Sequence, residues 1–178
     1  MTADIVQKIS FIEAGLIEIL GPESIQTKTD TIQLKAVKDA LAQQLGEDAA
    51  SGLLVRAGRA AFHHWMRQNA AALGWREVEF RLLPAPARIR RSLSALMDWL
   101  NREGALKAAL TDSGDRWQVR VAGLTEERAL FDCSTFLGIL QEACTWAGSG
   151  KFYPSRESAC KGTGAPECLF EIEKKSAD

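Results

Sequence analysis

The spacing of hydrophobic residues changes near residue 104 of this chain, and this change restricts the fold more than any other feature. Before it, apolar residues recur every three or four positions, as at Leu93, Leu96 and Leu100. After it they alternate with polar residues, as at Val119 and Val121. The first spacing is typical of amphipathic helices and the second of half-buried strands. We therefore expect helices first and an antiparallel sheet second, which is an α+β arrangement.

The N-terminal segment, up to the turn at residues 21–22, predicts a helix with a narrow apolar seam. Steps of four and three separate the seam residues Ile5, Ile9, Ile12, Leu16 and Ile19. Because such steps are typical of a heptad repeat, the seam either docks on the helix's own domain or contributes to a dimer interface. We treat residues 1–30 as a helical arm that is a candidate dimerisation element, and residues 31–178 as the domain.

Further helices are expected over about residues 31–46, Ser51–Leu73 and 88–102. The last of them follows a break at residues 82–86 and is expected to end at Glu103–Gly104, since glycine commonly stops a helix. In the longest helix, the basic residues that share one face are Arg56, Arg59, His63 and Arg67. We interpret this face either as a solvated surface or as a site for an acidic ligand or partner.

The C-terminal part predicts two hairpins with a helix between them. Two alternating runs flank a turn at Asp112–Asp115, and a helix follows over Cys133–Ala147 with Asp132 as its N-cap. Lys151–Ala159 and Cys168–Lys174 form the second hairpin. The N-terminal helices should therefore pack on an antiparallel sheet of about four strands in ββ-α-ββ order.

Charge and hydropathy argue against several classes of partner. The net charge of −1 gives no general electrostatic reason to bind nucleic acid or an anionic membrane. No stretch approaches the roughly 18 apolar residues that a membrane-spanning helix needs, and the N-terminus has no signal-peptide pattern. We expect a cytoplasmic protein without membrane insertion, whose thiols stay reduced. Its cysteines are then metal ligands, catalytic groups or core residues before they are disulfides.

The turn of the second hairpin concentrates groups that bind metals. Glu157 and Cys160 lie three residues apart, Cys168 closes the hairpin, and Cys133 would begin the preceding helix, whose N-terminus favours a thiolate. For Glu157 and Cys160 to converge, the strand must bulge or end between them. Three thiolates and one carboxylate suit tetrahedral Zn²⁺, and four protein ligands would make the ion structural. The excess negative charge would favour nearby cations, for which Arg156 and Lys161 are adjacent in sequence.

Two alternatives stay open from the spacing alone. The cysteines are then either unrelated thiols or, for Cys160 and Cys168, a disulfide across the hairpin. Cys144 lies on the same helix stripe as Leu137 and Leu140, so we expect it in the core.

These residues also carry a family resemblance. The motif is Glu157-x-x-Cys160-x-Gly162-x-Gly164-x3-Cys168-x-Phe170-x-Ile172, preceded by Cys133-x2-Phe136-x-Gly138. It resembles the 4-vinyl reductase (hydrocarbon-binding) domain, whose name comes from a protein implicated in bacteriochlorophyll biosynthesis. It is also similar to the sensory domains of phenol-responsive transcriptional activators and, in fold, to TRAPP subunits. The resemblance extends over about Ser51–Lys174.

The resemblance implies a domain with an enclosed apolar pocket, commonly dimeric, and a zinc ion. In the aromatic-sensing members, three cysteines and a glutamate hold the zinc, and they correspond here to Cys133, Cys160, Cys168 and Glu157. Those members hold a phenol hydroxyl with a histidine and a tryptophan. Here both histidines lie upstream of the matching position, and Trp117 corresponds only roughly to the tryptophan. The ATPase and DNA-binding domains of those activators have no counterpart in the sequence, which we therefore expect to be a stand-alone module.

We expect a sensor or carrier that holds a small hydrophobic ligand, aromatic or tetrapyrrole-related, in a pocket between the helices and the sheet. Large side chains with a polar group are what such a pocket needs, and the candidates are His64, Trp65, Trp99, Trp117, Trp146 and Tyr153. Each is otherwise ordinary core or surface. One alternative is an enzyme or accessory protein of (bacterio)chlorophyll biosynthesis that acts in vinyl-group reduction, although no G-x-G-x-x-G fingerprint is present. The other is a dimeric adaptor without ligand.

Overall fold

The structure is a computed structural model that describes residues 3–22, 34–102, 107–122 and 132–177, with side chains described from residue 11 in the first range and from residue 36 in the second. Its elements are α1 (Ala3–Leu20), α2 (Leu34–Leu45), α3 (Glu47–Asn69), α4 (Val78–Leu82), α5 (Ala85–Arg102), β1 (Lys107–Ser113), β2 (Arg116–Ala122), α6 (Cys133–Ala147), β3 (Ser155–Ala159) and β4 (Cys168–Glu173). None of the helices in these ranges combines the length and the apolar character that a membrane span requires.

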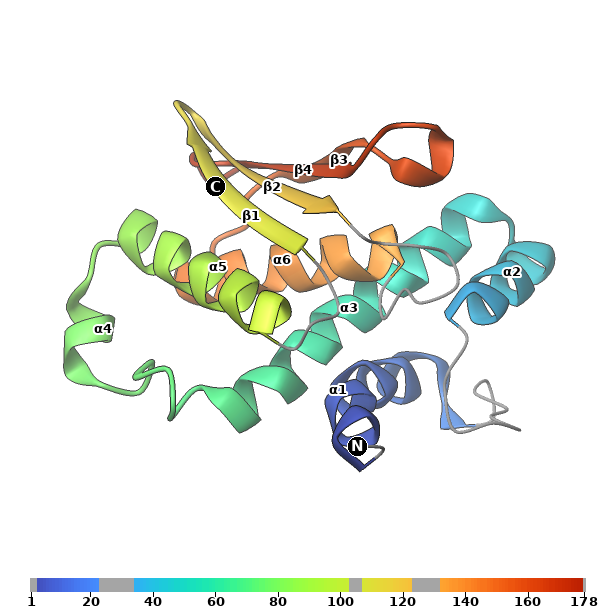
Figure 1. Cartoon of the computed structure of the whole chain (residues 1–178), viewed down its shortest axis with the longest axis horizontal. Helices are drawn as coiled ribbons and strands as arrows, with labels where there is room; N and C mark the ends of the chain where they lie inside the picture. The colour runs from blue at the N-terminus through green and yellow to red at the C-terminus, as the bar shows by residue number, and fades with distance from the viewer. Residues whose placement is uncertain (1–2, 23–33, 103–106, 123–131, 178) are drawn as a thin grey trace.

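The elements stack in layers (Figure 1). The strands form one antiparallel sheet in the order β1-β2-β4-β3. Helices α5 and α6 pack against this sheet, α3 packs on α6, and α1 packs on α3. The predicted α+β class, with helices first and strands in ββ-α-ββ order, is therefore confirmed.

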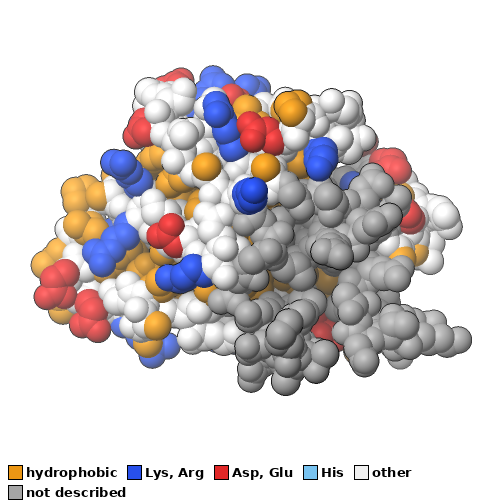
Figure 2. Space-filling model, viewed as in Figure 1, with side chains coloured by type: hydrophobic (Ala, Val, Ile, Leu, Met, Phe, Trp, Pro, Cys, Tyr) orange, Lys and Arg blue, Asp and Glu red, His pale blue; other side chains and the backbone are white. Residues whose placement is uncertain are grey.

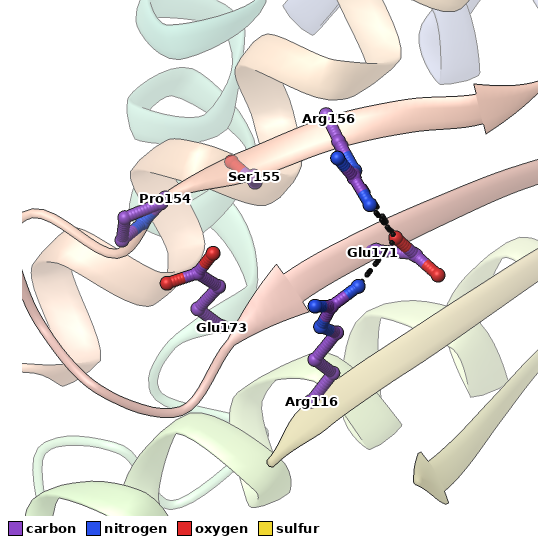
Figure 3. A pocket seen from close by; sticks show the side chains of 6 residues that line it. All are labelled: Arg116, Pro154, Ser155, Arg156, Glu171 and Glu173. Atoms are coloured by element: carbon purple, nitrogen blue, oxygen red, sulfur yellow. Dashed lines mark hydrogen bonds and ion pairs between the residues drawn. The ribbon is translucent and has the colours of Figure 1, made fainter.

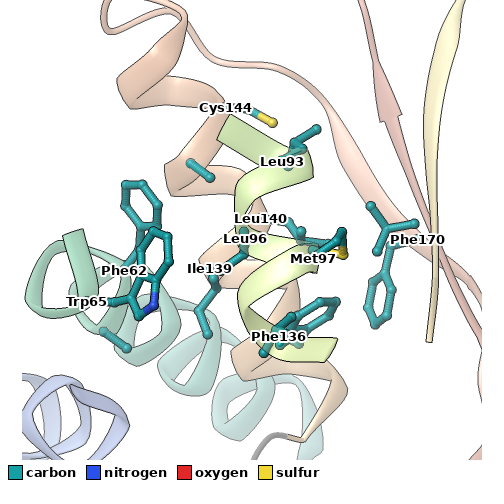
Figure 4. Packing of buried hydrophobic residues seen from close by; sticks show 14 of the residues in the cluster. Phe62, Trp65, Leu93, Leu96, Met97, Phe136, Ile139, Leu140, Cys144 and Phe170 are labelled. Carbon is teal, nitrogen blue, oxygen red and sulfur yellow. The ribbon is translucent and has the colours of Figure 1, made fainter. Parts of the chain in front are cut away.

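One face of the sheet forms the core with α5 and α6. In β2 and β4 the register pairs Trp117 with Ile172 and Val119 with Phe170, and all four side chains are buried. Figure 4 shows Phe170 reaching from the sheet toward the helices. Its ring meets that of Phe136 on α6 edge-to-face, with centroids 5.1 Å apart. This alternation is the pattern expected of strands that bury one face.

The helix layers touch through their backbones at two glycines. A methyl group on Gly58 of α3 would lie 1.9 Å from the carbonyl oxygen of Thr135, and one on Gly138 of α6 would lie 2.0 Å from that of Val55. Both distances are far below any real contact, so only hydrogen fits at these positions. The two glycines therefore set how closely α3 and α6 approach.

Helix α1 docks on its own domain through the middle of its seam. Ile12 and Leu16 are buried, Ile19 packs against the core, and Gly15 meets the α3 backbone near Ala57. The seam residues Ile5 and Ile9 lie outside the described side chains. A dimer role for residues 1–30 stays a prediction.

Several boundaries differ from the predictions in the helical half. The helix expected over Ser51–Leu73 begins four residues earlier, at Glu47, and ends at Asn69. Helix α4 has only five residues, too few to display a hydrophobic period, and was not predicted. Helix α5 begins at Ala85, inside the expected break, because Pro86 falls in its first turn, where no backbone N–H is needed. The helix end expected at residues 103–104 lies outside the described residues.

The last hairpin is also shorter than predicted. Strand β3 begins at Ser155 rather than Lys151. The preceding turn places Ser149 and Gly150 at positive φ, and Pro154 has no N–H to donate to a ladder. The carbonyl oxygen of Pro154 accepts from the backbone N–H of Glu173 at 2.9 Å, and the paired register with β4 begins at Ser155.

Candidate metal centre

Strand β3 contains the bulge that the spacing of Glu157 and Cys160 requires. Glu157 pairs with Phe170 and Ala159 with Leu169, so one extra residue, Ser158, is inserted between them. In a regular strand, residues three apart face opposite sides, but the extra residue turns Glu157 and Cys160 to the same side. The predicted irregularity is confirmed.

A compact turn then returns the chain to Cys168. Residues Lys161–Thr163 form one turn of 3-10 helix, and Gly164 follows in the left-handed region at φ 98°. The backbone N–H of Ala165 donates to the carbonyl oxygen of Cys160 at 3.1 Å, which closes the turn. Glycine is the residue that adopts this φ without strain.

Cys133 reaches the hairpin from the first position of α6. The side chain of Asp132 accepts a hydrogen bond of 2.6 Å from the backbone N–H of Thr135, which is an N-cap. This cap fixes where α6 begins and therefore where the Cys133 side chain lies. The predicted cap is confirmed.

The four ligand groups converge on one point. One atom each from Cys133, Glu157, Cys160 and Cys168 lies within 4.8 Å of all the others. The sulfur of Cys133 is 3.6 Å from that of Cys160 and 3.6 Å from that of Cys168. Around a tetrahedral zinc ion with bonds of about 2.3 Å, neighbouring sulfurs stand about 3.8 Å apart. The spacing of the thiols therefore fits such an ion.

The environment of the thiols opposes ionisation in the protein alone. Burial raises the pKa of the Cys133 thiol above its ordinary value, and the neighbouring Glu157 carboxylate raises it further. The same two causes raise the pKa of Cys160. The helix N-terminus was expected to lower the pKa of Cys133, but burial and a like charge outweigh it. Metal binding must therefore displace protons from these groups.

A buried carboxylate oxygen supports the same interpretation. Oε1 of Glu157 is buried and has no hydrogen-bond partner, which is costly for a polar atom unless something coordinates it. The backbone N–H of Lys161 donates to the sulfur of Cys168 at 3.4 Å, an outer contact of the kind that orients metal ligands. Three soft sulfurs and one oxygen are a donor set that zinc prefers.

The charged neighbours expected from the sequence do not both lie at the cluster. Arg156 instead donates to Oε2 of Glu171 from its Nε and Nη2 atoms, at 3.1 and 2.9 Å. Cys144, the remaining cysteine, is fully buried in the core as predicted. Burial raises the pKa of its thiol, so it is chemically quiet.

Three of the six candidate ligand residues share one aromatic cluster beside α3. Trp65 meets Trp99 edge-to-face at 5.8 Å between ring centroids, and Trp146 lies 6.3 Å from Phe62. Trp75 links the two tryptophans, at 5.6 Å from Trp65 and 5.0 Å from Trp146. Phe62 and Trp75 were not among the predicted residues, because neither stands on a recognised motif.

The indole nitrogen of Trp65 has an unusual position within this cluster. The side chain is 1% exposed, and its Nε1 atom has no hydrogen-bond partner. Buried tryptophan N–H groups usually find an acceptor. Among the candidates, Trp65 therefore has a polar atom that is both buried and without a hydrogen-bond partner.

The other three candidates lie apart from the aromatic cluster. Trp117 is buried on the inner face of β2, and Tyr153 is buried beneath Gly148. His64 is partly exposed, and its Nε2 atom lies 3.0 Å from Oε2 of Glu18 on α1. Each of the six stays a candidate for the pocket lining.

The basic face of α3 is partly neutralised by an acid that the sequence reading missed. Glu142 of α6 is 8% exposed. Its Oε2 atom accepts from Nε of Arg59 at 2.7 Å, and its Oε1 atom lies 2.8 Å from Nε2 of His63. Glu142 falls between apolar residues of its helix, and this was the only sequence signal that could have drawn attention to it.

A hollow lies on the outer face of the sheet (Figure 3). Two arginines, Arg116 and Arg156, converge there on Oε2 of Glu171. Both guanidinium groups hold the pKa of the Glu171 carboxyl below its ordinary value. Pro154, Ser155 and Glu173 complete the lining. Opposite charges already pair within this hollow, so its chemistry is that of a surface ion-pair network.

Comparisons with known proteins find the same fold in solved structures of low sequence identity. No protein-family model matches the chain, and no curated protein sequence matches it. Among solved structures, it is similar to the phenol-responsive sensory domain of the transcription activator PoxR, with 18% identity over 91% of this chain and 89% of that domain and a TM-score of 0.55.

Two H-NOX proteins are similar to a comparable degree. One, from S. oneidensis in its Fe(II)NO ligation state, has 13% identity over 94% of this chain and 89% of that chain, with a TM-score of 0.56. The other, from K. algicida in its Fe(II) unliganded form, has 11% identity over 94% of this chain and 96% of that chain, with a TM-score of 0.59. At such low identity, these likenesses show that the fold is shared and nothing further.

Proposed function

We propose that this protein is a small-molecule sensor or carrier domain with a structural zinc ion between α6 and the β3–β4 hairpin. The observation that carries the proposal is the convergence of Cys133, Glu157, Cys160 and Cys168 within 4.8 Å. The fold that the chain shares with the phenol-responsive domain of PoxR supports the sensory part. The resemblance of the same residues to zinc-binding aromatic sensors supports the metal part.

The zinc would act on structure rather than on a substrate. Four protein ligands fill a tetrahedral shell, so no position remains for a reactive water. Bound there, the ion would supply charge neutralisation for three thiolates and a carboxylate. Cys133 would tie the start of α6 to the hairpin, Cys160 and Cys168 would hold the two hairpin strands, and Glu157 would complete the shell.

The aromatic cluster of Phe62, Trp65, Trp75, Trp99 and Trp146 is the best-supported place for a ligand. Its rings pack on one another and Phe62, Trp65 and Trp75 are buried, so a ligand would have to part these rings, and Nε1 of Trp65 would then offer one donor to a hydroxyl or carbonyl oxygen. A small aromatic molecule with one such oxygen matches this chemistry. We propose a cytoplasmic homodimer that binds neither nucleic acid nor membranes. The vinyl-reductase and adaptor alternatives gain no support from any contact in the described residues.

Separate experiments test the metal and the ligand. Elemental analysis of the purified protein should find one zinc per chain, and Co²⁺ substitution should give the intense visible spectrum of tetrahedral thiolate coordination. Absence of metal together with freely titrating thiols would remove the zinc proposal. Thermal-shift and native mass spectrometry measurements with phenols, fatty acids and tetrapyrroles should show binding of an aromatic compound. Binding that survives Trp65→Phe unchanged would move the ligand site elsewhere, and silence across the panel would favour the adaptor.

A further inference from the structure

Cys133 is the sulfur that the other two thiols share. It lies 3.6 Å from the sulfur of Cys160 and 3.6 Å from that of Cys168. A disulfide bond is about 2.05 Å long, so either pair closes if the sulfurs approach by roughly 1.5 Å. Such a movement lies within the reach of side-chain rotation at a helix end and a turn.

Accessibility separates the two pairs. Cys133 and Cys160 are both partly exposed, whereas Cys168 is 1% exposed. The sulfur of Cys168 also accepts the backbone N–H of Lys161, which holds it in the hairpin. An oxidant from solvent therefore meets Cys133 and Cys160 first.

We infer that Cys133 and Cys160 form a reversible disulfide that competes with the metal, so that peroxides control the joint between α6 and the β3–β4 hairpin. The control of metal release rests on the proposed zinc site. The choice of partners rests on the positions and the exposure of the three sulfurs. It replaces the hairpin disulfide between Cys160 and Cys168 that the sequence spacing left open.

The chemistry needs one hydrogen peroxide molecule. The Cys160 thiol first gives its proton to solvent; the resulting thiolate attacks one peroxide oxygen, the O–O bond breaks, and a sulfenic acid and a hydroxide form. The Cys133 thiolate then attacks the Cys160 sulfur, the S–O bond breaks, and a disulfide and a second hydroxide form. The two sulfurs lose two electrons in total, the peroxide gains them, and the two hydroxides take up two protons to become water.

Oxidation would change how the joint is held. Zinc would lose two of its four ligands, and the remaining pair, Glu157 and Cys168, cannot hold a tetrahedral ion tightly. The ion would leave while α6 stays bonded to residue 160. A thiol reductant would reverse the change, because exchange regenerates both thiols.

The test treats the full chain with hydrogen peroxide in two forms, zinc-loaded and chelator-stripped, and maps the cysteines by peptide mass spectrometry. We expect a Cys133–Cys160 disulfide in both forms, and we expect it to form more slowly in the zinc-loaded protein. One zinc ion should be released for each disulfide formed, and a chromogenic zinc chelator measures this release. Dithiothreitol should restore both thiols and zinc uptake. Cys144, which is fully buried, is the internal control and should stay a thiol.

The outcomes separate this inference from the proposed function. If the chain takes up no zinc but the bridge forms, the metal proposal fails and the disulfide stands. If zinc is present and the bridge instead joins Cys160 to Cys168, or the thiols pass to sulfinic acid without a bridge, the inference is wrong. Zinc retained in a bridged protein would also overturn it. Cys133→Ser should abolish the bridge, and the mapping of the unmodified chain stands even if that variant folds poorly.

Discussion

Helix α6 packs on α3 along its length, and its first residue, Cys133, joins the ligand cluster of the β3–β4 hairpin. These two contacts are built from opposite kinds of chemistry. Against α3 the decisive feature is the absence of side chains at Gly58 and Gly138, which lets the two helix backbones touch where any side chain would collide. At the hairpin the decisive feature is an excess of ligand groups, with three thiols and a carboxylate gathered within 4.8 Å.

The difference between the two contacts lies in what they depend on. The close approach of α3 and α6 at the two glycines depends on neither a metal ion nor a protonation state, because glycine carries no titrating group. The hairpin joint, under the proposed function, needs a cation, deprotonated thiols and a reducing environment. Under the proposed function, the contact of α6 with α3 is therefore permanent and its contact with the metal ligands of the hairpin is conditional.

The largest expected effect breaks the permanent contact. In Gly58→Ala the new methyl group would lie 1.9 Å from the carbonyl oxygen of Thr135, so α3 and α6 must separate along their whole interface. We expect the free energy of unfolding to fall by about 3 kcal/mol or more. Urea denaturation followed by circular dichroism measures it.

Gly52→Ala is the matched control, because it lies in the same helix and an added methyl group there meets no atom within 4 Å. Alanine should stabilise α3 at this position by about 0.5–1 kcal/mol through its higher helix propensity. Equal losses from both substitutions would mean that the glycines matter through flexibility rather than through close approach.

The contact between α3 and α6 is also the part of the fold that could not be predicted from the sequence. Helical spacing predicts α3 and α6 as elements, but the sequence does not indicate which helix Gly58 or Gly138 contacts. The same holds for Glu142, whose partners Arg59 and His63 lie 83 and 79 residues away along the chain. Contacts of this kind depend on tertiary packing, which a periodic pattern does not specify.

The conditional joint was much more accessible to prediction. Glu157, Cys160 and Cys168 are close in sequence, and a hairpin must bring them together. The bulge at Ser158 followed from the demand that residues three apart share a side. Cys133 followed from a helix start with an N-cap. The aromatic cluster was predictable only in part. Trp65 lies on a predicted helical stripe, whereas Trp75 lies in a connection that has no periodic pattern.

The next largest expected effect is the pH dependence of zinc binding. Burial and Glu157 raise the pKa values of Cys133 and Cys160, so the metal-free protein keeps these thiols protonated and zinc must displace the protons. The stability that zinc adds is therefore present at higher pH and is lost on acidification. Lowering the pH by one unit should weaken zinc binding by about 1.4 kcal/mol for each proton displaced.

Competition with a chromogenic chelator between about pH 8 and about pH 6 measures this dependence, near the ordinary thiol range. The stability of the chelator-stripped protein over the same pH window is the control, and subtracting its change removes contributions from other groups, such as the His63–Glu142 pair between α3 and α6. Zinc affinity that is independent of pH would mean that the thiols are already ionised, against the pKa direction found here.

The smallest effect concerns the ion pairs that fasten α6 to the basic face of α3. In Glu142→Gln, Arg59 and His63 lose a charged acceptor, but their side chains are 43% and 44% exposed and can turn to water. We therefore expect the free energy of unfolding to fall by only about 1 kcal/mol. Glu18→Gln is the matched control, because Glu18 is 55% exposed and pairs with His64, and it should change stability by less than about 0.5 kcal/mol. A Glu142→Gln loss comparable with that of Gly58→Ala would show that charge, rather than close backbone approach, holds the permanent face of α6.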